Sequence, residues 1–162
     1  PDLQAGYEKA ISNVMAGLSG LNMVYESAGM HASLLGFCLE SLLLDNDMLG
    51  QCLRCVRGIE VTEDSLSLEV MRQVCTEGPG HYLGHSSTLE LMQRDYVYPE
   101  LGDRTSPKEW VEKGRPDVVE TATAVKKERL ASFFPRHVSS ELDKELRQRL
   151  PILLARKGMG LD

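Results

Sequence analysis

The sequence of 162 residues has no long apolar run and no excess of basic residues. No stretch approaches the roughly 18 to 20 apolar residues that a membrane-spanning helix needs, so we expect no membrane partner. A formal net charge of −6 argues against binding to nucleic acid, because phosphate contacts need a concentrated basic face. The start, Pro1-Asp2-Leu3-Gln4, lacks the features of a signal peptide. Because it begins with proline and not methionine, we expect the chain to be part of a longer polypeptide.

The motifs of several enzyme classes are absent as well. There is no nucleophile elbow, no zincin motif, no phosphate-binding P-loop and no Ser-His-Asp arrangement. Cys52-x-x-Cys55 followed by His81-x-x-x-His85 has the outline of a Cys₂His₂ zinc site, but the two pairs are too far apart for a classical finger. Buried thiols and unrelated histidines are the favoured interpretation.

The cysteine content is low. Cys38, Cys52, Cys55 and Cys75 all lie in apolar helical patterns, and a chain of this size does not need disulfides for stability. We therefore expect reduced, buried thiols in a cytoplasmic protein.

Apolar periodicity and capping signals predict a largely helical chain. The expected helices cover residues 3–18, 33–58, 63–74, 86–94, a segment that starts at 107, 116–133, and a segment from 140 that runs past 151. A capping box at Ser106 starts the fifth of these segments. Acidic residues at Glu40, Asp45 and Asp47, on an otherwise apolar helix, favour a helix break or hydrogen bonds to neighbouring helices.

The segment from Leu21 to His31 has the pattern of a βα unit: a short apolar run at residues 21–25, polar residues, a glycine, and then a helix. Chemistry in α/β folds lies at the carboxyl ends of strands, because the loops there meet on one face. Tyr25, Glu26 and His31 are therefore the first candidate site residues. One strand cannot form a sheet alone, so the chain is either all-α or an α/β protein whose other strands lie in missing sequence. The βα pattern favours the second.

A glycine-rich segment, Gly78-Pro79-Gly80-His81-Tyr82-Leu83-Gly84-His85, predicts a tight loop. The loop is either a helix terminator or the rim of an active site, and the residues favour neither. His81 is a weaker candidate than His31 for this reason.

Several motifs together resemble the trimethylamine methyltransferase family. They are Asp2-Leu3-Gln4-Ala5-Gly6-Tyr7-Glu8-Lys9, Leu39-Glu40-Ser41-Leu42 with Asp45-Asn46-Asp47, Arg57-Gly58-Ile59-Glu60-Val61, and Gly80-His81-Tyr82-Leu83-Gly84-His85 with Thr88-Leu89. Each motif is weak alone, but the set spans nearly the whole chain and keeps its order. The run from Tyr25 to His31 looks more like the quaternary-amine branch, whose members lack pyrrolysine, than like the trimethylamine branch.

This resemblance implies a fold and an activity. The chain looks like the C-terminal portion of an α/β TIM (β/α)₈ barrel, with the last βα units in residues 1–98 and a helical C-terminal extension in residues 99–162. Members of the family transfer a methyl group from a methylated amine, such as glycine betaine, to the cobalt of a corrinoid (cobalamin) carried by a separate corrinoid protein. The fragment alone would hold only part of an active site, and we expect it to be inactive by itself.

The resemblance also suggests roles for the candidate site residues. His31 is the leading catalytic candidate, as a group that orients the substrate rather than one that transfers a proton. Tyr25 and Glu26 would form one wall of a cage for the trimethylammonium group, and His81 is a weaker substrate-binding candidate at the rim. Contacts in the extension could support a homo-oligomer. The alternative to this enzyme is a non-catalytic helical protein-interaction module, in which residues 21–25 would be helical or buried without sheet partners and His31 would face the core.

Overall fold

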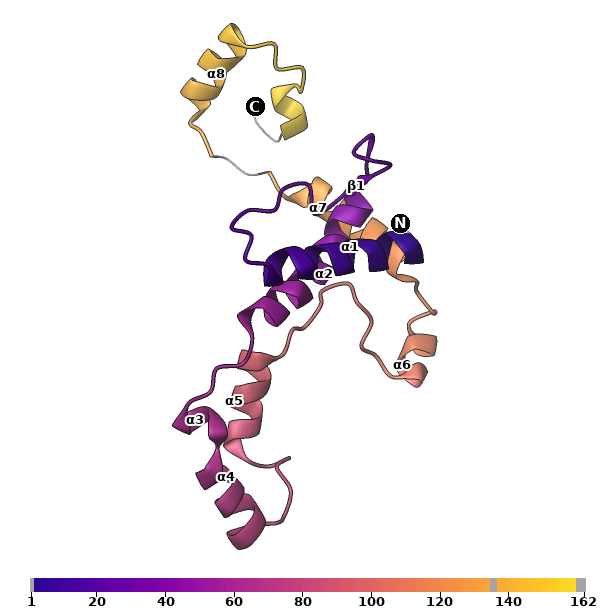
Figure 1. The fold of residues 1–162 in the computed structure, drawn as a ribbon. Coiled ribbons are helices and arrows are strands. Elements are labelled where there is room, and N and C mark those ends of the chain that lie inside the picture. The colour runs from indigo at the N-terminus through magenta and orange to yellow at the C-terminus, as the bar shows by residue number, and fades with distance from the viewer. Residues whose placement is uncertain (1, 135–136, 160–162) are drawn as a thin grey trace. The chain divides into compact units, whose positions relative to one another are not determined.

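The computed structural model describes residues 2–134 and 137–159 (Figure 1). Helices dominate this part of the chain, and the strands within it are two short ones. By their internal contacts the residues form two compact units, Pro1–Ala122 and Thr123–Asp162, which are described separately. The mostly helical content agrees with the sequence prediction and is compatible with a portion of a larger domain.

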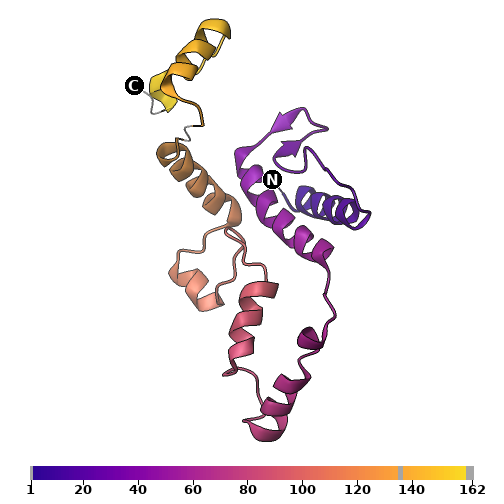
Figure 2. The same ribbon diagram turned by 90° about the vertical axis from the view of Figure 1, so that its left-hand side faces the viewer.

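The first unit is a succession of helices with one small hairpin near its start (Figures 1 and 2). Its elements are α1 (Leu3–Leu18), β1 (Met30–His31), β2 (Gly36–Phe37), α2 (Leu39–Arg57), α3 (Glu63–Leu66), α4 (Leu68–Arg72), a π-helical turn (Gln73–Glu77), α5 (Ser86–Asp95), α6 (Pro107–Glu112) and the beginning of α7 (Val118–Ser132).

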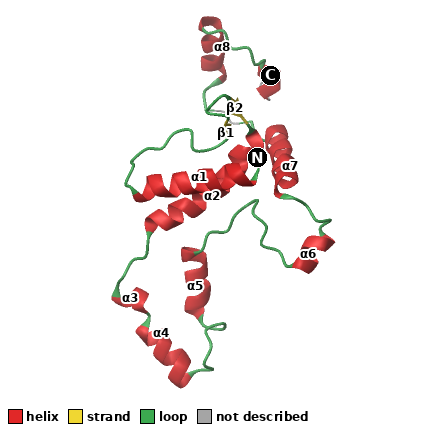
Figure 3. Ribbon diagram, turned by 45° about the vertical axis from the view of Figure 1, so that its right-hand side comes forward, coloured by secondary structure: helices red, strands yellow, loops and turns green. Residues whose placement is uncertain are grey.

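Helix α1 has the bounds that the sequence predicts, and it packs along α2 (Figure 3). The Asp2 side chain caps α1 by accepting a hydrogen bond from the Ala5 N–H at 2.8 Å. At Gly17 the helices approach so closely that a Cβ atom would lie 2.5 Å from Val56 Cγ2. The large apolar side chains of α1 lie on another face and are exposed: Leu3, Tyr7, Ile11, Met15 and Leu18.

Residues 21–25, which the sequence predicts to be a strand, are irregular and largely exposed. The strands lie further along, where β1 and β2 form an antiparallel hairpin in which Met30 is opposite Phe37 and His31 is opposite Gly36. A strand needs a hydrogen-bonded neighbour, and the hairpin supplies one for residues 30–31 but none for residues 21–25. The prediction of a strand at 21–25 is therefore wrong for this structure.

The helix that the sequence predicts from residue 33 begins only at Leu39. Residues 32–34 form the hairpin turn, with positive φ angles of 51°, 53° and 70°, and this left-handed conformation cannot be part of a right-handed helix. From Leu39 the helix continues without a break to Arg57, and Gly58 ends it with a φ of 68°. The predicted end of this helix at Gly58 is confirmed.

Several helix starts follow their capping signals. Thr62 and Ser65 form a capping box at α3, and Ser106 and Glu109 form the predicted one at α6. Ser67, with a left-handed φ of 55°, separates α3 from α4, and the π-helical turn follows α4 directly. Helix α5 lies where the sequence predicts a helix.

Asp47 attaches the segment after α5 to the middle of α2. Its carboxylate accepts three backbone N–H groups, from Glu100 at 3.0 Å, Leu101 at 2.6 Å and Gly102 at 3.1 Å. The Leu101 side chain is buried beside this contact. The sequence predicts a helix break or hydrogen bonds to neighbouring helices at this position, whereas Asp47 bonds to a non-helical segment and α2 continues unbroken.

We expect Asp47→Asn to loosen this attachment by about 1 to 2 kcal/mol, because an amide offers one acceptor oxygen in place of two. Amide hydrogen exchange at residues 100–102 would then become roughly tenfold faster. The matched control is Asn46→Ala, which changes the exposed neighbouring position on the same helix. Equal exchange rates in Asp47→Asn and wild type would contradict the assignment.

The second unit contains the rest of α7, α8 (Ser140–Arg149) and a 3₁₀ turn (Arg156–Met159). Buried Asp143 accepts hydrogen bonds from Arg147 and from Arg156, and so links α8 to the 3₁₀ turn. The predicted continuation of the last helix past Pro151 is wrong: α8 ends at Arg149. Proline restricts the residue before it and cannot donate the next helical hydrogen bond.

The cysteines differ in exposure. All four are free thiols, but only Cys52 is buried, whereas Cys55 and Cys75 are exposed and Cys38 is intermediate. The prediction of buried thiols is therefore wrong for Cys55 and Cys75. Burial raises the pKa of the Cys52 thiol, and the neighbouring Cys55 raises it further. Among the helices of residues 2–134 and 137–159, none is both long and apolar enough to cross a membrane.

Candidate functional site

A polar cluster lies where α1, the hairpin and α2 meet. At its base is Asp45, a buried carboxylate on α2. Asp45 Oδ2 accepts a hydrogen bond from Lys9 Nζ of α1 at 2.6 Å and another from the backbone N–H of Gly29 at 2.8 Å. A buried carboxylate is stable only when it is paired and hydrogen-bonded, and both conditions are met here. Asp45 thus fixes the loop that leads into β1.

His31 is held by the same helix one turn earlier. Its Nε2 atom lies 2.6 Å from the hydroxyl oxygen of Ser41, a residue with only 1% of its surface exposed. Ser41 and Asp45 are four residues apart on α2 and therefore share one face of it. One face of α2 thus makes two contacts with the hairpin region. Ser41 binds the ring of His31, and Asp45 binds the backbone N–H of Gly29, two residues earlier.

Two cavities adjoin His31. The first, of about 410 Å³, is lined by the hairpin turn, the start of α1 and Glu26. The second, of about 440 Å³, is lined by α1, by Ser41, Asp45 and neighbouring residues of α2, and by the start of α7. Both include Lys9 and His31 in their walls. Their volumes lie within the range of roughly 300 to 1,000 Å³ that is typical of small-molecule sites.

The structure brings some of the predicted site residues together. Glu26 and His31 both line the first cavity. Tyr25, 76% exposed, lines a separate hollow of about 460 Å³ together with Glu26. His81 lies in the exposed loop between the π-helical turn and α5, and it lines none of these cavities.

Glu26 has an uncommon backbone conformation. Its φ of 60° is left-handed, which costs energy for a residue with a side chain. Left-handed residues also form the hairpin turn at residues 32–34, on the wall of the same cavity. Backbone strain of this kind is concentrated at functional sites, so it favours this cavity as the candidate site.

Sequence reasoning did not identify Lys9 or Ser41 as part of this cluster. The available signal was the spacing of Ser41 and Asp45, two polar residues four apart on an otherwise apolar helix. Lys9 carried no such signal, because a lysine on an amphipathic helix ordinarily lies in solvent.

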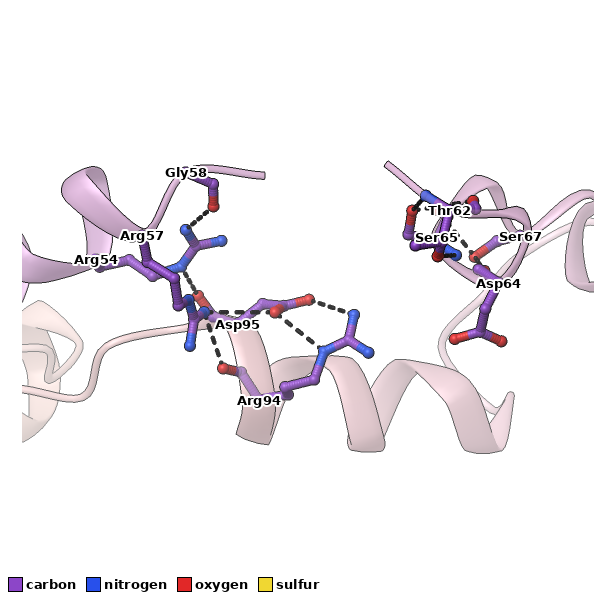
Figure 4. Close-up of polar contacts among 9 residues, drawn as sticks. All are labelled: Arg54, Arg57, Gly58, Thr62, Asp64, Ser65, Ser67, Arg94 and Asp95. Atoms are coloured by element: carbon purple, nitrogen blue, oxygen red, sulfur yellow. Dashed lines mark hydrogen bonds and ion pairs between the residues drawn. The ribbon is translucent and has the colours of Figure 1, made fainter. Parts of the chain in front are cut away.

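A second polar cluster joins the ends of α2 and α5 (Figure 4). The Arg54 guanidinium donates to the carbonyls of Asp95, at 2.7 Å, and Gly58, at 2.8 Å, while Arg57 donates to the carbonyl of Arg94 at 3.1 Å. Arg94 forms a bidentate pair with the Asp95 carboxylate, which lowers the pKa of Asp95. Arginine side chains that bond the last carbonyls of helices stabilise helix ends.

The cavity beside this cluster, of about 700 Å³, has a balanced lining of charged residues. The positive members are Arg54, Arg57 and Arg94, and the negative ones are Glu60, Asp64 and Asp95. Its guanidinium groups are already used on carbonyls and on Asp95. These contacts favour a structural link between helices rather than an anion site.

The described residues contain no group of three or more His, Cys, Asp or Glu side chains placed to hold a metal ion. Cys52 and Cys55 lie on α2, whereas His81 and His85 lie on the loop before α5. His85 is instead engaged at the start of that helix, where its Nδ1 accepts from the Ser87 N–H at 3.2 Å.

Comparison with known proteins gives consistent relatives. A glycine betaine methyltransferase of Desulfitobacterium hafniense is 30% identical over 146 residues, which make up 90% of this chain and 30% of that protein. Trimethylamine methyltransferase MttB of Methanosarcina thermophila is 32% identical over 148 residues, or 90% of this chain and 29% of that protein. A second protein of Desulfitobacterium hafniense, also named trimethylamine methyltransferase MttB, is 28% identical over 147 residues, or 91% of this chain and 29% of its own length.

The chain therefore spans about three tenths of the length of these curated relatives. The family profile described as trimethylamine methyltransferase (MTTB) matches residues 1–157, which is nearly the whole chain. By this match the chain belongs to the trimethylamine methyltransferase family.

Proposed function

We propose that this chain is the C-terminal part of a methyltransferase that moves a methyl group from a quaternary amine, such as glycine betaine, to the Co(I) of a corrinoid protein. Membership of the family supports methyl transfer from a methylated amine. The single observation that carries the assignment to this region is the cavity that Glu26 and His31 share. The free thiols agree with a cytoplasmic location, which is part of the proposal.

In this proposal, residues 1–98 supply the last βα units of a TIM barrel and residues 99–162 a helical extension. The exposed apolar stripe of α1, from Leu3 to Leu18, supports this placement, because such a stripe is normally covered in a folded protein. The relatives have ample additional length to supply the cover.

The chemistry needs little from the protein beyond binding and alignment. When the N–CH₃ bond of a quaternary amine breaks, its electron pair stays on nitrogen and a neutral tertiary amine leaves, so no proton is required. The two electrons of the new cobalt–carbon bond come from Co(I), which becomes Co(III). The corrinoid is a substrate carried by its own protein, and no residue of this chain is assigned to it. The chain's task is to hold the cation, aim the methyl group and exclude water.

Three side chains suit these tasks. The Glu26 carboxylate would attract the ammonium group, and the Tyr25 ring offers a face for a cation–π contact. His31, which lines the same cavity as Glu26, would donate a hydrogen bond to the carboxylate of a betaine. His81 lines none of the cavities that these three residues line, so it is a weaker candidate.

The test uses the full-length protein that contains this chain, with its corrinoid protein reduced to Co(I). Cobalt absorbance is followed after addition of glycine betaine, carnitine or trimethylamine. We expect conversion to methyl-Co(III) with glycine betaine, at least tenfold faster than with trimethylamine. Conversion with trimethylamine alone would keep the family chemistry and overturn the quaternary-amine assignment. No conversion with any amine would favour the helical interaction module.

A further inference from the structure

We propose that Ser41 is a positioning residue that fixes the tautomer of His31, so that the imidazole offers its Nδ1–H group to the substrate. The geometry of the Ser41–His31 pair carries this inference. Only the identity of the substrate rests on the proposed function.

The direction of the hydrogen bond follows from the burial of Ser41. Its hydroxyl lies 2.6 Å from His31 Nε2, and 1% of the residue is exposed. Within residues 2–134 and 137–159 the Ser41 hydroxyl makes no other hydrogen bond. A buried hydroxyl proton needs an acceptor, and an unprotonated Nε2 is the acceptor within reach. Ser41 therefore donates to Nε2, and the ring proton of neutral His31 is on Nδ1.

The surrounding contacts hold this arrangement in place. Asp45, one turn after Ser41 on α2, accepts the Gly29 N–H at 2.8 Å and so fixes the backbone two residues before His31. Pairing of His31 with Gly36 in the hairpin fixes the backbone of His31 itself. Among the described residues, Nδ1 has no hydrogen-bond partner, and His31 lines both adjoining cavities.

The tautomer decides what His31 can recognise. With a proton on Nδ1 the ring is a donor toward the cavity, which suits a carboxylate oxygen such as that of a betaine. With the proton on Nε2 the ring would instead present a lone pair to that carboxylate and repel it. Trimethylamine has no carboxylate, so the tautomer should matter far less for it.

The primary test reads the tautomer directly. Full-length protein with ¹⁵N-labelled histidine is studied by NMR near neutral pH, where protonated and unprotonated ring nitrogens have well-separated shifts, and the His31 signals are identified by their loss in His31→Gln. We expect Nδ1 protonated and Nε2 unprotonated in wild type. We expect Ser41→Thr to keep this pattern and Ser41→Ala to shift it toward the Nε2–H form. The control Ser19→Ala removes an exposed hydroxyl at the end of α1, outside both cavities, and should change nothing.

A wild-type protein with Nε2 protonated would overturn the proposal, and so would an unchanged tautomer in Ser41→Ala. The wild-type measurement stands even if Ser41→Ala fails to fold. In methyl transfer we expect Ser41→Ala to raise KM for glycine betaine about five- to tenfold with little change in kcat, and Ser41→Thr to restore it. If no amine is a substrate, the proposed function fails while the tautomer result still decides the role of Ser41.

Discussion

Replacing Asp45 by alanine is expected to destabilise the contact between α1, the hairpin and α2 by about 3 to 5 kcal/mol. The substitution removes the acceptor of two hydrogen bonds at once and leaves the Lys9 ammonium, with a side chain only 18% exposed, without its counter-ion. Removing one member of a poorly exposed ion pair lowers the stability by more than the intact pair adds to it. The remaining charge is shielded from water and no longer has a partner.

The loss should appear first in the hairpin. Amide hydrogen exchange of the full-length protein would show faster exchange at residues 28–38, above all at Gly29, whose N–H donates to Asp45. Gln51→Ala, at an exposed position of the same helix, provides the matched control and should leave these rates unchanged. If the hairpin amides exchange as slowly in Asp45→Ala as in wild type, the hydrogen bonds to Asp45 do not hold the hairpin in place.

Replacing His31 by alanine is expected to lower kcat/KM for glycine betaine roughly 10- to 100-fold, which corresponds to the loss of one hydrogen bond to a charged group. His31 lines both cavities, and Glu26 is part of the lining of the first. Because the proposed role is donation to the substrate carboxylate, a substrate without a carboxylate should lose much less. The ratio of the two losses is the informative quantity.

His31→Gln and His81→Ala complete this comparison. Glutamine keeps an N–H donor and should recover part of the activity. The exposed His81 lies outside the cavity, and its replacement should cost less than threefold. An equal loss with glycine betaine and with trimethylamine in His31→Ala would point to a structural role, and a larger loss in His81→Ala would move the site to the loop at residues 78–85.

Local signals predicted helices well where capping residues and periodicity agree. Helix α1 has its predicted bounds, and the capping box at Ser106 is present. Periodicity did not reveal which face of α1 is covered. Apolar positions that defined the helix, such as Tyr7, Ile11 and Met15, are exposed, and α2 approaches α1 closely at Gly17. Close approach of two helices favours small side chains, and no apolar pattern encodes this.

The hairpin was not predictable from the same rules. Its turn consists of Ala32, Ser33 and Leu34 in left-handed conformations, without the glycine or asparagine that usually marks such a turn. Gly29, just before it, was visible in the sequence, but its role is tertiary: with a φ of 79°, a Cβ there would lie 2.5 Å from the Phe37 ring. The apolar run at residues 21–25 has strand-like composition but no partner strand among residues 2–134 and 137–159.

The candidate site was predicted in part. The sequence points to Glu26 and His31 by their place after an apolar run, and both residues line one cavity although that run is not a strand. Ser41 and Asp45 act through contacts over ten and sixteen residues of sequence, which spacing alone cannot assign. Their roles depend on the packing of the hairpin against α2.

The most direct test of the proposed methyl transfer follows the methyl group itself. Glycine betaine with deuterated N-methyl groups is mixed with the full-length protein and its corrinoid protein in the Co(I) state, and both products are analysed by mass spectrometry after a single turnover. The proposal predicts one deuterated methyl group on cobalt for each dimethylglycine formed, the latter retaining two labelled methyl groups. Cobalt that stays unlabelled while the enzyme is folded and betaine is present would contradict it.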